Sequence, residues 1–163
     1  MNLQQISTLV GQELLRRQQR LITVESCTGG SIAQVITAIA GSSAWFEGGF
    51  ITYSNASKVA LVGVSAAVLA SAGAVSAEVV EAMVAGGCQR IGAQWGVAVS
   101  GVAGPGGGTP DKPVGTVYIA WQDGKQYIWS CRFFFEGDRE EVRLQTVQAA
   151  LQGLLSALRS YPW

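Results

Sequence analysis

The chain has 163 residues with 11 basic and 11 acidic side chains, no histidine and a formal net charge of zero. This length predicts one domain covering residues 1–163, and the balanced charge, without a basic stripe, argues against DNA or RNA as a partner. The absence of histidine excludes a Ser-His-Asp arrangement, so a serine or cysteine nucleophile would need a lysine, a tyrosine or a carboxylate as its base.

Helical and strand patterns alternate along the chain. Apolar residues at helical spacing predict an amphipathic helix over the first twenty residues. Four elements are predicted next: a strand at Leu21–Val24, a helix at Ser31–Ala40, a strand at Gly49–Tyr53 and a helix from about Asn55. The remaining elements are a helix at Glu78–Ile91, strands at Gly96–Ser100, Val114–Trp121 and Gln126–Phe135, and a helix at Asp138–Leu158. With Asp123-Gly124 as a hairpin turn, the order predicts an α/β fold, a three-layer α/β/α sandwich with a mixed, partly parallel sheet.

Residues Val59–Ala77 form a run of 19 residues without charge, long enough in principle to span a bilayer. Alanine, serine and glycine dominate the run, and Gly63 and Gly73 interrupt it. Ser65 and Ser76 each resemble a helix N-cap. The run therefore predicts the end of one helix, a short turn element and the start of a second helix, with no membrane span.

The first twenty residues also lack the continuous apolar core of a signal peptide, which predicts a cytoplasmic protein. Cys27, Cys88 and Cys131 are odd in number and widely spaced, as expected of reduced thiols. Without histidine, a zinc site would need all three cysteines and a carboxylate, so no metal is expected.

Nucleophile-type side chains gather where the apolar run Leu21–Val24 meets two glycines, in the order Ser26, Cys27, Thr28, Gly29, Gly30. Backbone N–H groups at the start of the following helix would be unpaired and would hold a phosphate or a developing oxyanion. Equally, Thr28 would merely cap the helix while the glycines permit a tight turn. Strand alternation turns Cys27 away from Ser26 and favours a buried thiol.

A second candidate lies in the segment Tyr53–Lys58. With Ser54 as N-cap, Lys58 falls near the fourth helical position, where the positive helix end disfavours the ammonium form. A lysine held neutral can act as a base. The competing interpretation is a solvated surface lysine beside a strand-end aromatic residue, Tyr53.

The loop Gly101–Gly108 follows a predicted strand, so its glycines can bring the backbone close to a ligand. It ends without a Gly-Lys-Ser/Thr sequence and lacks the dinucleotide fingerprint, so a nucleoside triphosphate is not implied. Arg139, with Arg143 one turn on, offers cationic contacts to a phosphate. Pairing with Glu140 and Glu141 on a solvated helix face is the alternative.

Taken together, seven ordered motifs resemble the CinA C-terminal domain family, the nicotinamide mononucleotide deamidases, over nearly the whole chain. The motifs are Glu25–Gly30, Gly41–Ser43, Gly48–Asn55, Gly73–Ser76, Ser100–Gly108, Lys112–Val117 and Gly137–Arg139. One departure is Ser100, which is threonine in many relatives and keeps the hydroxyl. The resemblance implies an α/β/α sandwich, as the pattern of elements already indicates.

The resemblance also implies a reaction, the hydrolysis of nicotinamide mononucleotide to nicotinic acid mononucleotide and ammonia without metal or organic cofactor. It makes Ser26 the nucleophile, with Tyr53 and Lys58 beside it. We expect Lys58 to take the Ser26 proton, Tyr53 to relay or orient that proton, and N–H groups around residues 28–30 to hold the oxyanion. The expected substrate-binding residues are Thr28, Gly29, Gly30, Ser100, Gly101, Gly104, Pro105, Gly106 and Arg139. Which loop holds the ribose phosphate and which the amide stays open.

Two other functions remain open, a non-catalytic nucleotide-binding module and a structural or interaction domain. The second is motivated by the apolar strand Tyr127–Phe135. A hydrophobic content of 48% with only 13% charged residues leaves little polar surface for a lone small domain. We therefore expect a homo-oligomer, most simply a dimer.

Overall fold

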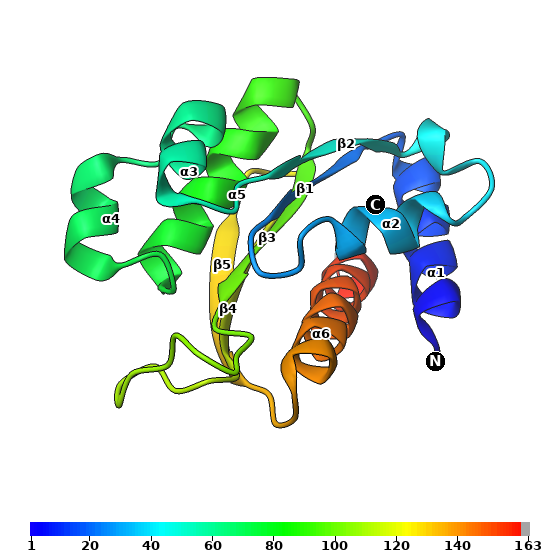
Figure 1. The fold of residues 1–163 in the computed structure, drawn as a ribbon. Helices are drawn as coiled ribbons and strands as arrows, with labels where there is room; N and C mark the ends of the chain where they lie inside the picture. The colour runs from blue at the N-terminus through cyan, green and yellow to red at the C-terminus, as the bar shows by residue number, and fades with distance from the viewer. Residues whose placement is uncertain (161–163) are drawn as a thin grey trace.

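The computed structural model describes residues 1–160, which form an α/β fold around a five-stranded sheet (Figure 1). The sheet has the order β2-β1-β3-β4-β5. Its strands are β1 (Leu21–Glu25), β2 (Phe46–Ile51), β3 (Trp95–Gly101), β4 (Thr116–Gln122) and β5 (Ile128–Phe134). β1 runs parallel to both β2 and β3, whereas β3–β4 and β4–β5 are antiparallel. The predicted mixed, partly parallel sheet is confirmed.

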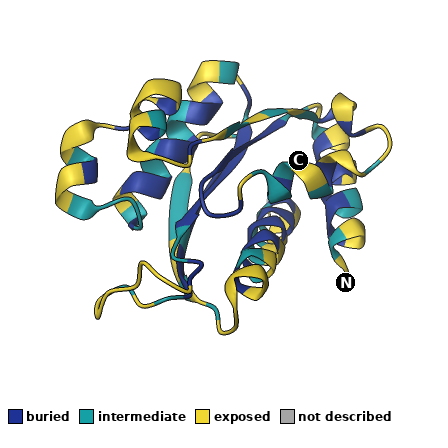
Figure 2. Cartoon of the chain, viewed as in Figure 1, coloured by how far each residue is buried: buried dark blue, intermediate teal, exposed yellow. Residues whose placement is uncertain are grey.

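Helices cover both faces of the sheet. They are α1 (Leu3–Arg17), α2 (Ser31–Thr37), α3 (Asn55–Val62), α4 (Ala66–Ala72), α5 (Ala77–Ile91) and α6 (Arg139–Ser160), with a short 3₁₀ helix, η1, at Ser42–Ala44. One apolar core lies between the sheet and α1, α2 and α6, and a second lies between the sheet and α3, α4 and α5. Because both faces are covered, β1 and β3 are buried along almost their whole length (Figure 2).

The strand predicted at Gly49–Tyr53 is displaced from the observed β2, which starts three residues earlier and ends at Ile51. Two glycines in the middle of β2 hide its strand pattern. A Cβ atom at Gly49 would lie 2.3 Å from the Thr23 Oγ1 atom of β1, so the close contact between these strands requires glycine there. The helix predicted at Ser31–Ala40 is also shorter, because α2 ends at Thr37.

The uncharged run at residues 59–77 folds as three pieces of helix. α3 ends at Val62, and α5 begins after Ser76, whose hydroxyl accepts a hydrogen bond from the Val79 N–H. Between them, the expected short turn element is a seven-residue helix, α4, with Ser65 at its N-cap position. No helix within residues 1–160 combines the length and the apolar character needed to cross a membrane.

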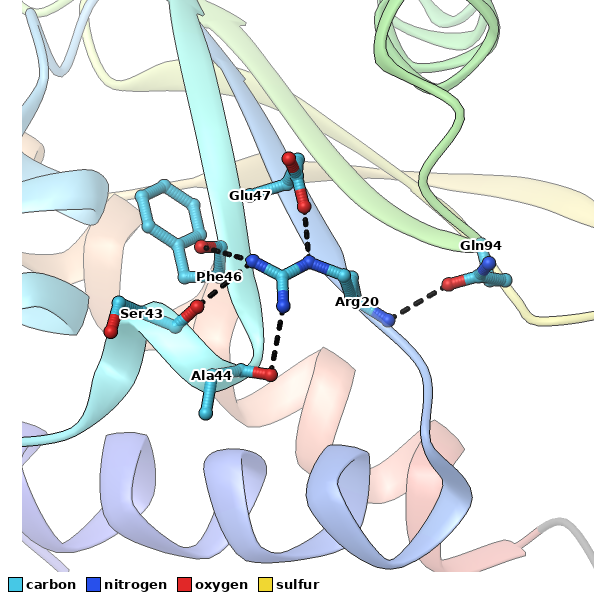
Figure 3. Close-up of polar contacts among 6 residues, drawn as sticks. All are labelled: Arg20, Ser43, Ala44, Phe46, Glu47 and Gln94. Carbon is cyan, nitrogen blue, oxygen red and sulfur yellow. Dashed lines mark hydrogen bonds and ion pairs between the residues drawn. The ribbon is translucent and has the colours of Figure 1, made fainter.

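Arg20 fixes the start of β1 to its neighbours at the end of the sheet where β1 begins (Figure 3). Its guanidinium forms an ion pair with Glu47 and donates to the carbonyl oxygens of Ser43 and Ala44, each at 2.9 Å. Its main-chain N–H donates to Gln94 Oε1 at 2.8 Å, just before β3. These contacts hold the three parallel strands in register, which positions the residues at their opposite, carboxyl ends.

Candidate active site

A cavity of about 310 Å³ opens at the carboxyl ends of β1 and β3. From β1 the chain passes to β2 on one side, and from β2 it crosses back to β3 on the other side of β1. Such a reversal of strand order creates a crevice where ligands of open α/β sheets bind. The cavity is lined at the strand ends by Ser26 and by Ser100 and Gly101, three of the residues expected in the site.

Ser26 and Lys58 meet in this cavity. Ser26 directly follows β1, and its N–H donates to the carbonyl oxygen of Val99 in β3 at 3.1 Å. Lys58 lies in the first turns of α3, whose N-cap is Ser54, as the sequence predicts. The Lys58 Nζ atom is 3.1 Å from Ser26 Oγ. The structure therefore brings the predicted nucleophile and the predicted base within hydrogen-bond distance.

Lys58 is buried, with only 1% of its side chain surface exposed, which contradicts the alternative of a solvated surface lysine. Its Nζ atom donates to the carbonyl oxygens of Thr52 at 2.7 Å and Tyr53 at 3.3 Å. All of these acceptors are uncharged, so no carboxylate offsets the loss of hydration. Burial therefore lowers the pKa of Lys58 from its ordinary value of 10.5, which favours the neutral amine that a base needs.

Tyr53 and Arg139 close the exposed side of the cavity. The Tyr53 side chain is 61% exposed, and its hydroxyl accepts a hydrogen bond from Arg139 Nη2 at 3.1 Å. Arg139, the first residue of α6, also donates to the carbonyl oxygen of Gly104 at 2.7 Å. Tyr53 contacts Lys58 through its main-chain carbonyl rather than its ring. Arg139 thus links Tyr53, which follows β2, to the glycine loop (Gly101–Gly108) on the other side of the cavity.

The turn after Ser26 differs from the sequence prediction. Thr28, Gly29 and Gly30 do not line the cavity, and the Gly29 N–H, expected to be unpaired, donates to the Ser26 carbonyl at 3.1 Å. The anion at the start of α2 is the buried Glu25 carboxylate, which accepts from Thr28 Oγ1 at 2.6 Å. It also accepts from the first N–H groups of α2, those of residues 32 and 33 at 2.9 and 3.1 Å. Gly29 and Gly30 have φ angles of +60° and +105°, so their role is the tight turn.

Arg143 is also placed differently from expectation. Its Nε and Nη2 atoms donate to the carbonyl oxygens of Cys27 and Thr28, both at 3.1 Å, instead of facing the cavity. Arg143 therefore fastens the turn that carries Ser26 to α6. Glu25 and Arg143 hold this turn from two sides, a structural role that no motif in the sequence indicates.

The thiol of Cys27 is buried, as predicted, and burial raises its pKa to about 12. At neutral pH it is therefore a protonated and weak nucleophile. Cys88 and Cys131 are free as well, Cys88 buried and Cys131 exposed. Across residues 1–160, no group of three or more cysteine, aspartate or glutamate side chains lies close enough to hold a metal ion.

The remaining cavity lining comes largely from the glycine loop. Gly104 and Gly106 line the cavity as expected, while Pro105 faces a neighbouring cavity of about 590 Å³ that shares Ala103 and Arg139. Val102, Ala103 and Gly107 also line the cavity and lie in the loop expected to approach the ligand, whereas Ala74 and Val75 were not expected there. The motif Gly73–Ser76 contains these last two, but its place beside Ser26 depends on how α4 and α5 pack.

The protein is thus an α/β protein with a buried serine–lysine pair at a topological switch point of its sheet. The family model described as the CinA C-terminal domain matches residues 3–158. The chain belongs to this family.

Two curated relatives bear the name nicotinamide-nucleotide amidohydrolase PncC. The one from Pseudomonas putida is 57% identical over 150 residues, which are 92% of this chain and 93% of that protein. The one from Escherichia coli K12 is 49% identical over 152 residues, 93% and 92% of the two chains. A crystal structure of the competence damage-inducible protein A from Klebsiella pneumoniae is 36% identical, with a TM-score of 0.95 and coverage of 99% and 100%.

Proposed function

We propose that the protein hydrolyses the carboxamide of nicotinamide mononucleotide to give nicotinic acid mononucleotide and ammonia. The names and nearly full-length coverage of the two amidohydrolase relatives support this substrate class. The single observation that carries the proposal is the 3.1 Å contact between Ser26 Oγ and the Nζ atom of a buried lysine. A serine beside a neutral amine is an activated nucleophile of the type that attacks amides.

The first half of the reaction forms an acyl-enzyme. Neutral Lys58 takes the hydroxyl proton of Ser26 as Oγ adds to the amide carbon. The resulting oxyanion accepts hydrogen bonds from main-chain N–H groups beside the nucleophile, for which the cavity-lining Cys27 is our candidate. Collapse of the tetrahedral intermediate breaks the C–N bond, and the Lys58 ammonium gives its proton to the departing nitrogen, which leaves as ammonia.

The second half releases the acid. A water molecule gives a proton to Lys58 as its oxygen adds to the ester carbon. The bond to Ser26 Oγ then breaks, Oγ regains a proton from Lys58, and the carboxylic acid product loses its own proton to solvent. Each atom is accounted for without metal or organic cofactor, which is why we propose that none is needed.

The glycine loop and Arg139 are our candidates for the ribose phosphate. Arg139 is the cation at the cavity wall, and Gly104 and Gly106 allow main-chain N–H groups to approach an anion. Ser26 and Lys58 lie at the other wall, so the amide of the substrate lies at the carboxyl end of β1 and the N-terminal end of α3. Tyr53, held by Arg139, orients the substrate between them.

Incubation of purified protein with nicotinamide mononucleotide, with and without a chelator, tests the proposal. We expect ammonia and nicotinic acid mononucleotide in equal amounts in both arms. A wild-type protein that binds the nucleotide without releasing ammonia would instead be a binding module. The hydrogen-bonded serine–lysine pair argues against that alternative.

A further inference from the structure

Within the described residues, the outer edge of the sheet at β5 is unpaired. β5 is the last strand in the sheet order and pairs only with β4 within residues 1–160. It contains no proline or glycine, and Arg132 is its only charged residue. Soluble proteins usually shield such edges with lysine, proline, bulges or a covering segment. Cys131 and Phe134 are exposed here, Phe134 to 60%.

Two backbone hydrogen bonds of the hairpin establish which backbone groups face outwards. The Phe135 N–H donates to Gly115 O at 2.9 Å, and Tyr127 O accepts from the Asp123 N–H at 3.0 Å. Backbone groups alternate in direction along an antiparallel strand. Odd-numbered residues from 127 to 135 therefore bond towards β4, and even-numbered residues from 128 to 134 direct their N–H and C=O groups to the free edge.

We propose that β5 pairs with β5 of a second copy of this chain, antiparallel, about a two-fold axis at Cys131. The midpoint of Ile128–Phe134 is residue 131, so this register alone pairs the whole strand with itself. Each outward-facing residue then bonds to an outward-facing residue of the other copy. Cys131 lies opposite Cys131 of the second copy as a non-hydrogen-bonded pair, with Cα atoms about 4.5 Å apart.

The side chains are complementary in this register. On the α6 face of the sheet, Trp129 meets Phe133 of the second copy, which extends the aromatic layer that each copy already has. On the α5 face, Ile128 meets Phe134 of the second copy. These pairs cover apolar surface that one copy alone leaves to solvent.

Charges are complementary as well. Arg132 lies opposite Ser130 of the second copy, and within each copy the Ser130 hydroxyl donates to Glu81 Oε1 at 2.8 Å. Within one copy the Arg132 guanidinium donates to Asp111 O at 2.6 Å and to the Tyr118 hydroxyl at 3.3 Å, so it turns away from β4 to reach the Glu81 carboxylate of the other copy. A register centred on Arg132 would instead place like charges directly opposite. This inference does not depend on the proposed reaction.

Disulfide trapping tests the register. Cys27 and Cys88 are buried, so mild oxidation addresses Cys131, and the expected Cα separation allows a disulfide. We expect a non-reducing gel band at twice 17.1 kDa that disappears in Cys131→Ser. As a control, Ala67→Cys in the Cys131→Ser variant places the exposed thiol on α4, away from β5. This variant should not form the disulfide-linked dimer. Equal trapping of both thiols would overturn the register.

Light scattering at micromolar concentration tests the assembly itself. Cys131→Lys places like charges opposite each other at an exposed position and should reduce the mass to 17.1 kDa. Ala67→Lys adds the same charge on α4 and should leave the dimer intact. Ser130→Pro removes an outward-facing N–H without breaking a bond to β4, so it gives a second route to monomer. Circular dichroism identifies variants that remain folded. A wild-type mass of 17.1 kDa, or a dimer that survives in both folded β5 variants, would overturn the proposal.

Discussion

Replacement of Lys58 with methionine removes the proposed base while keeping most of the packing of its side chain. Methionine keeps an unbranched stem where the native side chain is only 1% exposed, but it removes the Nζ atom that contacts Ser26 and Thr52. Loss of a general base typically costs ~100-fold or more. A factor of 100 corresponds to about 2.7 kcal/mol of transition-state stabilisation. The value of kcat/KM for ammonia release from nicotinamide mononucleotide measures this loss.

The pH dependence of the same variant supplies the decisive contrast. Burial lowers the pKa of Lys58, and the base must be neutral, so wild-type kcat/KM should rise as pH increases through the folded-state pKa and then level off. Lys58→Met should lack this rising limb. A variant that keeps both the limb and activity within about ten-fold of wild type, where a base contributes ~100-fold, would refute the assignment of Lys58 as base.

Stability should respond to pH through the same group. Because the folded-state pKa lies below 10.5, the unfolded chain binds the lysine proton more tightly. The free energy of unfolding therefore gains a contribution from Lys58 as pH rises from the folded-state pKa to 10.5. Urea denaturation of wild type and Lys58→Met across this window should show that only the wild type has this increase.

The remaining predictions concern the nucleophile, the two arginines and the buried carboxylate. Ser26→Ala should abolish ammonia release with the fold intact, whereas Cys27→Ala should be tolerated; a larger loss at Cys27 would transfer the role to the thiol. Arg139→Gln should mainly raise KM because a phosphate contact is lost. Arg143→Gln should mainly lower kcat because the turn carrying Ser26 is loosened, and the same kcat and KM pattern in both arginine variants would contradict these roles. Glu25→Gln should lower the free energy of unfolding in urea by about 1–3 kcal/mol, the cost of leaving a buried donor unpaired; an unchanged unfolding midpoint would show that the carboxylate is dispensable.

Much of the fold follows from local patterns in the sequence. β1 and β3 are short apolar runs ended by polar or glycine residues, as expected of strands buried on both faces. β2 was harder to place because Gly48 and Gly49 carry no side-chain pattern, and the reason for glycine is the approach of Thr23 on the neighbouring strand. α4 shows the same limit. Its alanines and serines are compatible with a loop or a helix, and packing of Leu69 against the second core favours the helix.

The candidate site divides in a similar way. Ser26 and Lys58 could be proposed separately because each follows a recognisable strand end or N-cap, whereas their 3.1 Å contact depends on the parallel pairing of β1 and β2. The contact between Tyr53 and Arg139 joins residues 86 positions apart. No local pattern gives such a distance. Only the packing of α6 against the loops at the carboxyl ends of the strands brings the two residues together.

The start of α2, after Ser26, shows why residue spacing alone predicted a substrate anion where the structure has the Glu25 carboxylate. A strand followed by Ser-Cys-Thr-Gly-Gly predicts free N–H groups at the start of α2, and the positive end of a helix does attract an anion. The structure satisfies both expectations with Glu25, the last residue of β1, whose carboxylate contacts the first N–H groups of α2. Because the Glu25 carboxylate already binds these N–H groups, this end of α2 cannot also hold the substrate's phosphate. The hydrogen bonds of Glu25 instead fasten the end of β1 to the start of α2, so that the turn between them holds Ser26 against Lys58.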